Sequence, residues 1–186
     1  YEFDKVLDSQ RKKVYRDRTT ALMAAPETIA KQMVIYAELT VDDILEANIP
    51  REGDIEDELF QATLAKFTQY CGEFGGITVE QMKSKYAEGY EELREFLREA
   101  GRQGYYKKVE IVEDAQPGLM VQAQRYFIIS QIDRNWKEPL TEYKLEGFRL
   151  FQDMMVQVRR NVIYSVYQFK AARMEKVEDE VTADSS

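Results

Sequence analysis

Apolar side chains recur at alternating steps of three and four residues along most of the chain, a spacing typical of helices that bury one face. The last such stretch is the most regular, with a near-heptad stripe through Phe148, Phe151, Met155, Val158, Val162, Val166 and Phe169. The same spacing predicts further helices over about residues 1–22, 27–47, 59–70, 90–100 and 119–136. The sequence contains no Asn-Gly or Asp-Gly hairpin signal. The pattern therefore predicts an all-α fold.

Proline residues mark several ends of these helices. Pro26 and Pro50 separate the first three, and Pro139 closes the helix over 119–136. Because the link after Pro139 is short, the last two helices are predicted to pair as an antiparallel two-helix hairpin. Residues 171–186 have no apolar periodicity and are expected to be disordered.

The middle of the chain carries local signals of a different kind. Thr78 and Gln81 have the spacing of a capping box, which predicts a short helix beginning there. Gly101 and Gly104 are expected to interrupt a helix that resumes to about Asp114.

Charge divides the chain into regions. The net charge of −8 over 186 residues is the sum of +2 for residues 1–36, −10 for 37–117, +3 for 118–170 and −3 for 171–186. An acidic middle of this kind is either a solvated surface or a peripheral insertion between two parts of one scaffold. The acidic balance argues against nucleic acid as a partner, and no apolar run is long enough to span a membrane.

Few residues offer catalytic or metal chemistry. The chain has no histidine and a single cysteine, Cys71, which excludes a Ser-His-Asp triad, a Cys-His dyad and a His-ligated zinc site. Asp42-Asp43 could act as paired carboxylates, but adjacent helical side chains diverge by about 100°. Arg159-Arg160 and Lys12-Lys13 could contact phosphates or acidic lipid headgroups, although a solvated helix face is the simpler explanation. We therefore expect no catalytic residue, no cofactor-binding residue and no metal site in this segment.

Five segments in order along the chain resemble SecA, the ATPase motor of preprotein translocation, in its plastid and cyanobacterial form. They are YEFDKVLDSQRKKVY at 1–15, YAELTVDDILEANI at 36–49, IDRNWKE at 132–138, EYKLEGFRLFQDMM at 142–155 and RRNVIYSVYQF at 159–169. The resemblance implies a long scaffold helix, a helical wing insertion and a two-helix finger. It divides the chain into scaffold (1–48), acidic wing (49–116), finger (117–170) and disordered tail (171–186).

The resemblance also implies roles for particular residues and partners. Contacts of the scaffold with the rest of the motor are expected at Tyr1, Asp4, Gln10 and Arg11, and packing at the base of the finger at Trp136, Tyr143 and Phe148. ATP and Mg²⁺ would be bound by nucleotide-binding domains outside this segment. The expected partners are those domains, the SecY/SecE channel, unfolded preprotein and an anionic membrane surface. The expected location is the chloroplast stroma and thylakoid membrane, or a cyanobacterial cytoplasm and inner membrane.

One departure from the family concerns the finger. After Trp-Lys-Glu the family continues with His-Leu, more helix and a tip loop, whereas Glu138 here runs directly into Pro139-Leu140. The tip of the finger is therefore expected to be missing, either through a real deletion or because a segment between Glu138 and Pro139 is absent from the sequence given. Since Tyr1 already lies in a helical pattern, the chain is expected to be part of a longer protein. The alternative is a stand-alone helical adaptor that binds a partner protein.

Overall fold

The computed structural model describes residues 2–72, 76–136 and 147–171. These residues form seven α-helices and contain no strand, which confirms the all-α prediction for this part of the chain. The helices are α1 (Glu2–Met23), α2 (Pro26–Asn48), α3 (Asp57–Tyr70), α4 (Val79–Glu88), α5 (Tyr90–Ala115), α6 (Leu119–Asn135) and α7 (Gly147–Gln168).

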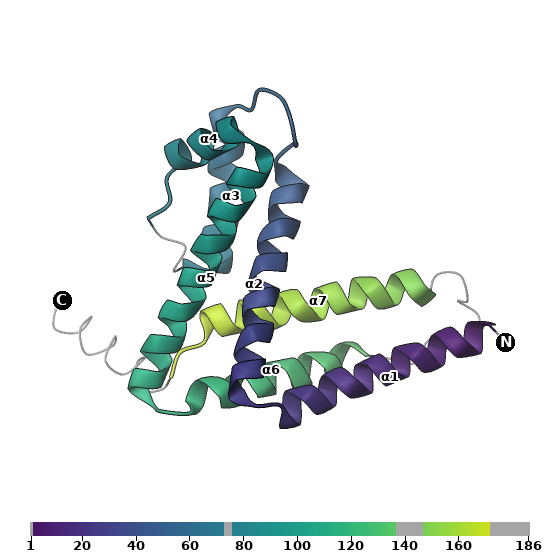
Figure 1. Cartoon of the computed structure of the whole chain (residues 1–186). Coiled ribbons are helices and arrows are strands. Elements are labelled where there is room, and N and C mark those ends of the chain that lie inside the picture. The colour runs from purple at the N-terminus through teal and green to yellow at the C-terminus, as the bar shows by residue number, and fades with distance from the viewer. Residues whose placement is uncertain (1, 73–75, 137–146, 172–186) are drawn as a thin grey trace.

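The helices form two arms that meet at a steep angle (Figure 1). The lower arm contains α1, α6 and α7, and the upper arm contains α2, α3, α4 and α5, with α4 at its far end. The chain enters the upper arm through α2 and leaves it through α5, and these two helices pack along each other. In the lower arm α6 and α7 pack in opposite directions, as the predicted hairpin requires.

A single apolar core extends through both arms. Met33 and Leu45 of α2, Leu97 and Val112 of α5 and Ile163 of α7 are all fully buried. Burial of each such side chain stabilises the fold by about 1.5–3 kcal/mol relative to leaving it exposed. Because the core is continuous, neither arm can separate from the other without exposing apolar surface.

Two helix starts follow local sequence rules. Thr78 Oγ1 accepts a hydrogen bond from the Gln81 backbone N–H at 3.1 Å, and Gln81 Oε1 accepts one from the Thr78 N–H at 2.9 Å, which confirms the capping box. Gly118 has a φ of +83° where the chain turns into α6, a conformation that favours glycine. The Glu113 carboxylate accepts the N–H groups of Gly118 and Met120 at 2.7 and 3.2 Å. It thereby satisfies donors at the start of α6.

The interruption predicted at Gly101 and Gly104 is wrong. Helix α5 is continuous, and both glycines are buried within it. Tyr167 Oη of α7 donates a hydrogen bond to the Gly101 carbonyl at 2.8 Å. Glycine inside a helix costs about 1 kcal/mol relative to alanine, and here the packing of α5 on its neighbours outweighs that local cost.

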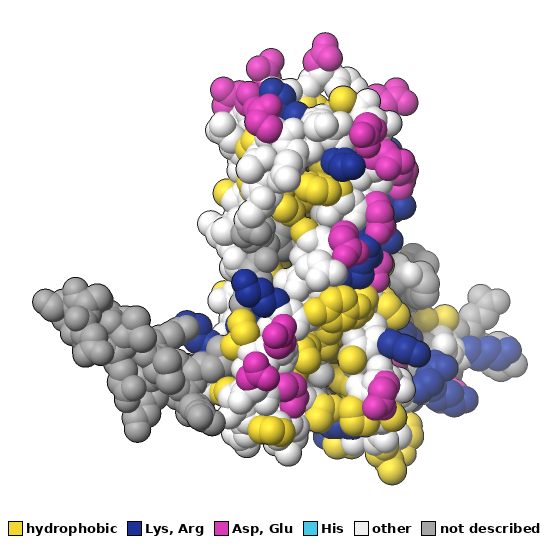
Figure 2. Space-filling model, turned by 60° about the vertical axis from the view of Figure 1, so that its left-hand side comes forward, with side chains coloured by type: hydrophobic (Ala, Val, Ile, Leu, Met, Phe, Trp, Pro, Cys, Tyr) yellow, Lys and Arg dark blue, Asp and Glu magenta, His cyan; other side chains and the backbone are white. Residues whose placement is uncertain are grey.

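The acidic middle of the chain forms much of the surface of the upper arm. Figure 2 shows acidic side chains gathered at its free end and down one side. On that arm Arg98 pairs with both carboxylate oxygens of Asp42, and Arg102 lies 3.3 Å from Glu38. Both arginines belong to α5 and both acids to α2, so these ion pairs join the two long helices of the arm.

The described residues contain neither a membrane-spanning helix nor a cluster of metal-binding side chains. None of the helices combines the length and the apolar character that crossing a bilayer requires. In the same residues no group of three or more acidic or cysteine side chains is arranged to hold a metal ion. The tail predicted to be disordered spans residues 171–186, of which only Ala171 belongs to the described part.

The capping box predicts a local stability effect. Replacing Thr78 by alanine removes the side-chain acceptor at the start of α4, so the free energy of unfolding should fall by about 1 kcal/mol in urea titrations. Ser84→Ala, in the same helix and exposed, is the matched control and should change it by less than about 0.5 kcal/mol. Equal losses in the two variants would contradict a specific role for the cap.

Candidate functional site

The feature best placed for a mechanical role is the junction where the end of α7 meets the upper arm. We define the junction by Asp43 of α2, Tyr70 of α3, and Arg159, Arg160 and Gln168 of α7. The Arg159 guanidinium donates to Asp43, and Arg160 Nε lies 3.6 Å from the same carboxylate. Tyr70 Oη donates to the Arg160 carbonyl, and Gln168 Nε2 donates to the Tyr70 carbonyl at 3.0 Å. Three helices are thus joined through side chains at one place.

A second set of contacts joins the lower arm to α5. Besides the bond from Tyr167 to Gly101, the Lys108 ammonium donates to the Phe169 carbonyl at 3.1 Å. Lys108 is only 4% exposed, so its charge depends on such acceptors. Tyr105 Oη donates to Gln124 Oε1 of α6, a buried pair. Both helices of the hairpin therefore contact α5 by hydrogen bonds as well as by apolar packing.

Within the lower arm, two arginines attach α1 to α6. Arg18 of α1 contacts both oxygens of Asp133 on α6, at 3.0 and 3.2 Å. Arg125 of α6 donates to the carbonyls of Ala21 and Ala24 at the end of α1. These carbonyls accept no hydrogen bond inside the helix, so Arg125 supplies the donor that they lack. Its positive charge also interacts favourably with the negative end of the α1 dipole. Side-chain hydrogen bonds thus attach the C-terminal half of α1 to α6.

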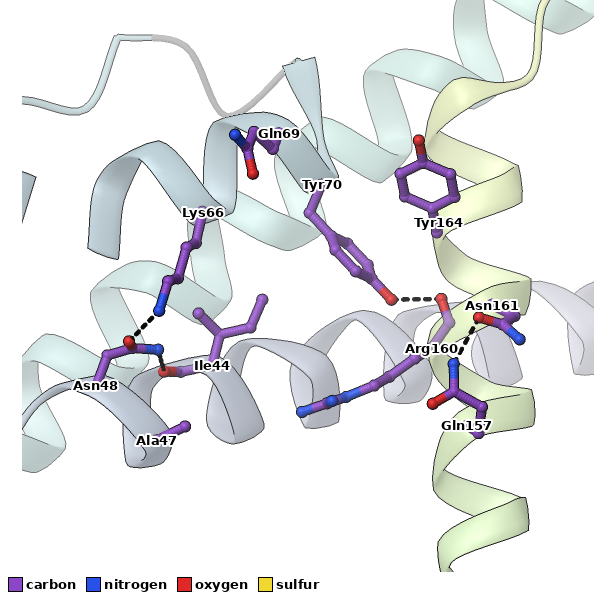
Figure 3. A pocket seen from close by; sticks show the side chains of 10 residues that line it. All are labelled: Ile44, Ala47, Asn48, Lys66, Gln69, Tyr70, Gln157, Arg160, Asn161 and Tyr164. Carbon is purple, nitrogen blue, oxygen red and sulfur yellow. Dashed lines mark hydrogen bonds between the residues drawn. The ribbon is translucent and has the colours of Figure 1, made fainter. Parts of the chain in front are cut away.

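A hollow of about 820 Å³ lies beside the junction, between α2, α3 and α7 (Figure 3). Its ten lining residues are Ile44, Ala47, Asn48, Lys66, Gln69, Tyr70, Gln157, Arg160, Asn161 and Tyr164. Lys66 donates to Asn48 Oδ1, and Gln157 donates to Asn161 Oδ1 at 2.8 Å. The rings of Tyr70 and Tyr164 meet edge to face with centroids 5.5 Å apart. The wall combines apolar and polar side chains and contains no carboxylate.

The residues expected to contact the rest of the motor are only partly described. Tyr1 lies outside the described residues, and Asp4 lies in α1 with its side chain outside them. Gln10 is 5% exposed and lines a groove between α1 and α7, whereas Arg11 is exposed. Gln10 and Arg11 therefore face different surroundings. Their role in motor contacts stays a prediction.

The expected base of the finger is described at one residue. Trp136, at the end of α6, meets Phe151 of α7 edge to face, with centroids 5.6 Å apart and an interplanar angle of 85°. Phe148 lies in α7 with its side chain outside the described residues, and Tyr143 falls outside them entirely. The packing role of these three residues at the base of the finger stays a prediction.

Sequence reasoning gave only part of the junction. The argument that Asp42 and Asp43 diverge agrees with the structure, since Asp42 pairs with α5 and Asp43 with α7. The simpler explanation of Arg159 as a solvated residue does not hold, because its side chain is 16% exposed and ion-paired. Arg159 and Asp43 are 116 residues apart in sequence, and no local pattern relates them. The only feature of the sequence that indicated the junction was the pair Arg159-Arg160 beside the apolar stripe of the last helix.

Among the described tyrosines, burial raises the pKa most strongly at Tyr36, Tyr70 and Tyr105. Burial, and then the charge of Asp17, raises the pKa of Tyr36 to about 12, and Arg159 opposes this shift. Burial also raises the pKa of Tyr70 and of Tyr105. The neutral phenols therefore persist well above the ordinary tyrosine range.

Most of the chain matches a known protein family. Residues 1–141 match the family described as the SecA Wing and Scaffold domain. The chain belongs to this family. The matched range contains α1 to α6 of this SecA wing and scaffold chain, and α7 continues beyond it. The boundaries drawn at residues 48, 116 and 170 stay predictions.

Curated relatives cover nearly the whole chain. A chloroplastic protein translocase subunit of Arabidopsis thaliana is 44% identical over 96% of this chain and 19% of its own length. The chloroplastic SecA of Pisum sativum is 41% identical over 100% and 20%, and the SecA of Thermosynechococcus vestitus is 34% identical over 91% and 20%. The SecA chain thus spans about a fifth of these relatives. No solved structure matches it.

The alignment with the pea protein bears on the finger. It spans 207 positions and uses all 186 residues of this chain, so about 21 positions have no counterpart here. The missing tip expected between Glu138 and Pro139 would account for such a difference. Where these positions fall along the chain stays a prediction.

The junction predicts a stability difference between two aspartates. Asp43→Asn leaves the mostly buried Arg159 without its carboxylate, and the free energy of unfolding should fall by about 2 kcal/mol. Asp8→Asn breaks the exposed pair with Lys12 and should cost less than about 1 kcal/mol. Urea unfolding followed by circular dichroism measures both. A loss at Asp43 no larger than that at Asp8 would show that the junction pair contributes little.

The raised pKa of Tyr36 predicts an alkaline effect. The folded pKa is about 12 and the unfolded pKa about 10, so the stabilisation is complete below about pH 10 and is lost as pH rises toward 12. Tyr36→Phe should make the fall in unfolding free energy over this interval shallower, measured by urea titrations at a series of pH values. Tyr126→Phe removes an exposed ring and is the control. An unchanged slope in Tyr36→Phe would contradict the shift.

Proposed function

We propose that the chain is the scaffold, wing and finger segment of a SecA motor, and that it couples nucleotide-driven domain movement to the passage of preprotein through the SecY/SecE channel. Membership of the SecA wing and scaffold family supports this proposal. So do the relatives, which are named protein translocase subunits. ATP and Mg²⁺ would be bound by other domains of the motor, and this segment would contribute no catalytic group.

The junction is the observation that carries the mechanical part of the proposal. Helix α7 contacts α2 through Asp43, α3 through Tyr70 and α5 through Gly101, all from its C-terminal half. A helix is stiff along its axis because its backbone hydrogen bonds are satisfied internally. A displacement at the junction would therefore move the other end of α7, where the finger would meet its substrate.

The path from the nucleotide-binding domains would enter through α1. Arg18 and Arg125 attach α1 to α6, and α6 packs along α7. Of the expected scaffold contacts, Asp4, Gln10 and Arg11 belong to the N-terminal half of this helix. The relatives favour a chloroplast or cyanobacterial setting, in which the motor would act at the thylakoid or inner membrane.

A graft into a full-length relative tests the coupling. The matching segment of the Arabidopsis subunit would be replaced by this chain, with the relative's own link retained in place of the short Glu138–Pro139 connection. We expect this chimera to transport preprotein. Introducing Asp43→Asn together with Tyr70→Phe should reduce preprotein moved per ATP hydrolysed about threefold or more, because these changes remove two bonds of the junction.

The controls separate coupling from folding and from the link. The chimera with Asp8→Asn should keep its ratio of transport to hydrolysis. The chimera with the short link should hydrolyse ATP and fail to transport. A junction variant with an unchanged ratio would contradict the coupling proposal. A chimera that neither hydrolyses ATP nor transports with either link would instead favour the stand-alone adaptor.

A further inference from the structure

The hollow beside the junction differs in charge from the rest of the upper arm. Lys66 and Arg160 are the only charged residues among its ten lining residues, and both are cationic. The other polar groups are two phenols and the amides of Asn48, Gln69, Gln157 and Asn161. The sequence that forms most of the upper arm, residues 37–117, carries a net charge of −10. A wall without any carboxylate in such a region indicates a place suited to an anion.

The two cations approach the hollow from different helices. Figure 3 shows Lys66 reaching down from α3 toward Asn48, and the Arg160 side chain extending from α7 toward α2. The Arg160 backbone carbonyl accepts the Tyr70 hydroxyl, which fixes this part of α7. The Arg160 side chain is 38% exposed, so its guanidinium is accessible from solvent.

The nearby aspartate does not neutralise these cations. Asp43 is hydrogen-bonded to Arg159, and its carboxylate lies 3.6 Å from Arg160 Nε, beyond good hydrogen-bonding distance. Arg160 Nε is buried and has no hydrogen-bond partner among the described residues. Asp43 thus supplies one negative charge, whereas Arg159, Arg160 and Lys66 supply three positive charges. These four groups leave two positive charges in excess.

We propose that this hollow binds a phosphate group between Lys66 and Arg160. A guanidinium presents a planar fork that matches phosphate oxygens, and an ammonium adds a compact charge. The amide N–H group of Gln157, which donates to Asn161 Oδ1 in this structure, supplies a further donor once it turns toward the ligand. A doubly charged phosphate matches the excess of two positive charges better than a single carboxylate does.

The position of the site gives the bound phosphate a structural effect. Lys66 belongs to the upper arm and Arg160 to the lower arm, so a phosphate that contacts both bridges the gap between α3 and α7. This inference goes beyond the proposed translocation function, and its test uses the 186-residue chain alone. The phosphate can come from a soluble phosphate compound or from a phospholipid headgroup, since both present the same oxygens.

The first experiment titrates the chain with inorganic phosphate and follows the heat of binding by calorimetry. Chloride replaces phosphate in the reference titration, so that the ionic strength stays constant. We expect saturable binding with one site. Lys66→Gln and Arg160→Gln should each weaken it about tenfold, the loss of one charge-assisted contact. Lys83→Gln is the matched control, because Lys83 is on α4, pairs with Asp57 and does not line the hollow. It should bind phosphate within about twofold of the parent chain.

Lys66→Gln keeps the test decisive if Arg160→Gln unfolds, since Lys66 is exposed and its loss does not touch the junction. Absence of saturable binding, or equal weakening in Lys66→Gln and Lys83→Gln, would overturn the proposal.

A second experiment identifies the source of the phosphate and uses vesicles of phosphatidic acid and of phosphatidylcholine. Binding to the former that inorganic phosphate displaces and Lys66→Gln abolishes would assign the site to a headgroup. Phosphate binding without vesicle binding would assign it to a soluble compound.

Discussion

Helix α7 has to bury its apolar stripe and, at the same end, satisfy polar groups from three other helices. Val158, Val162 and Val166 are fully buried, and the arginines between them point to the neighbouring helices. The Asp43–Arg159 pair is the point at which these requirements meet, because it fixes the rotation of α7 about its axis. If α7 turned, the stripe would leave the core and the arginine would lose its carboxylate. The positions of the other helices, including the angle between the two arms, depend on this rotation of α7.

Much of the fold could be predicted from the sequence because its signals are local. The alternating steps of three and four gave the helices, Pro26 and Pro50 gave two of the breaks, and Thr78 with Gln81 gave the start of α4. The glycines of α5 were misread for a physical reason. Propensity counts the cost of each glycine in isolation, whereas burial against α7 supplies the compensating contacts.

The candidate site was much less predictable. Its partners lie on helices that are neighbours only in three dimensions, so charge pairs such as Arg159 with Asp43 and Arg98 with Asp42 leave no periodic trace. Divergence of adjacent helical side chains did predict that Asp42 and Asp43 serve different partners. What it could not supply was the direction in which α5 and α7 approach α2. That direction is set by the whole core rather than by any segment.

The attachment of α1 has a consequence for how the chain acquires its structure. Its partner Asp133 follows Arg18 by 115 residues, and Arg125 follows Ala21 by 104. During synthesis at about 5–20 residues per second, several seconds pass before α6 exists to cover the apolar face of α1. The upper arm, whose helices are close in sequence, can form in that interval, since local contacts form faster than distant ones. The first of these seven helices to be made is therefore among the last to be packed, and its apolar face stays uncovered in the meantime.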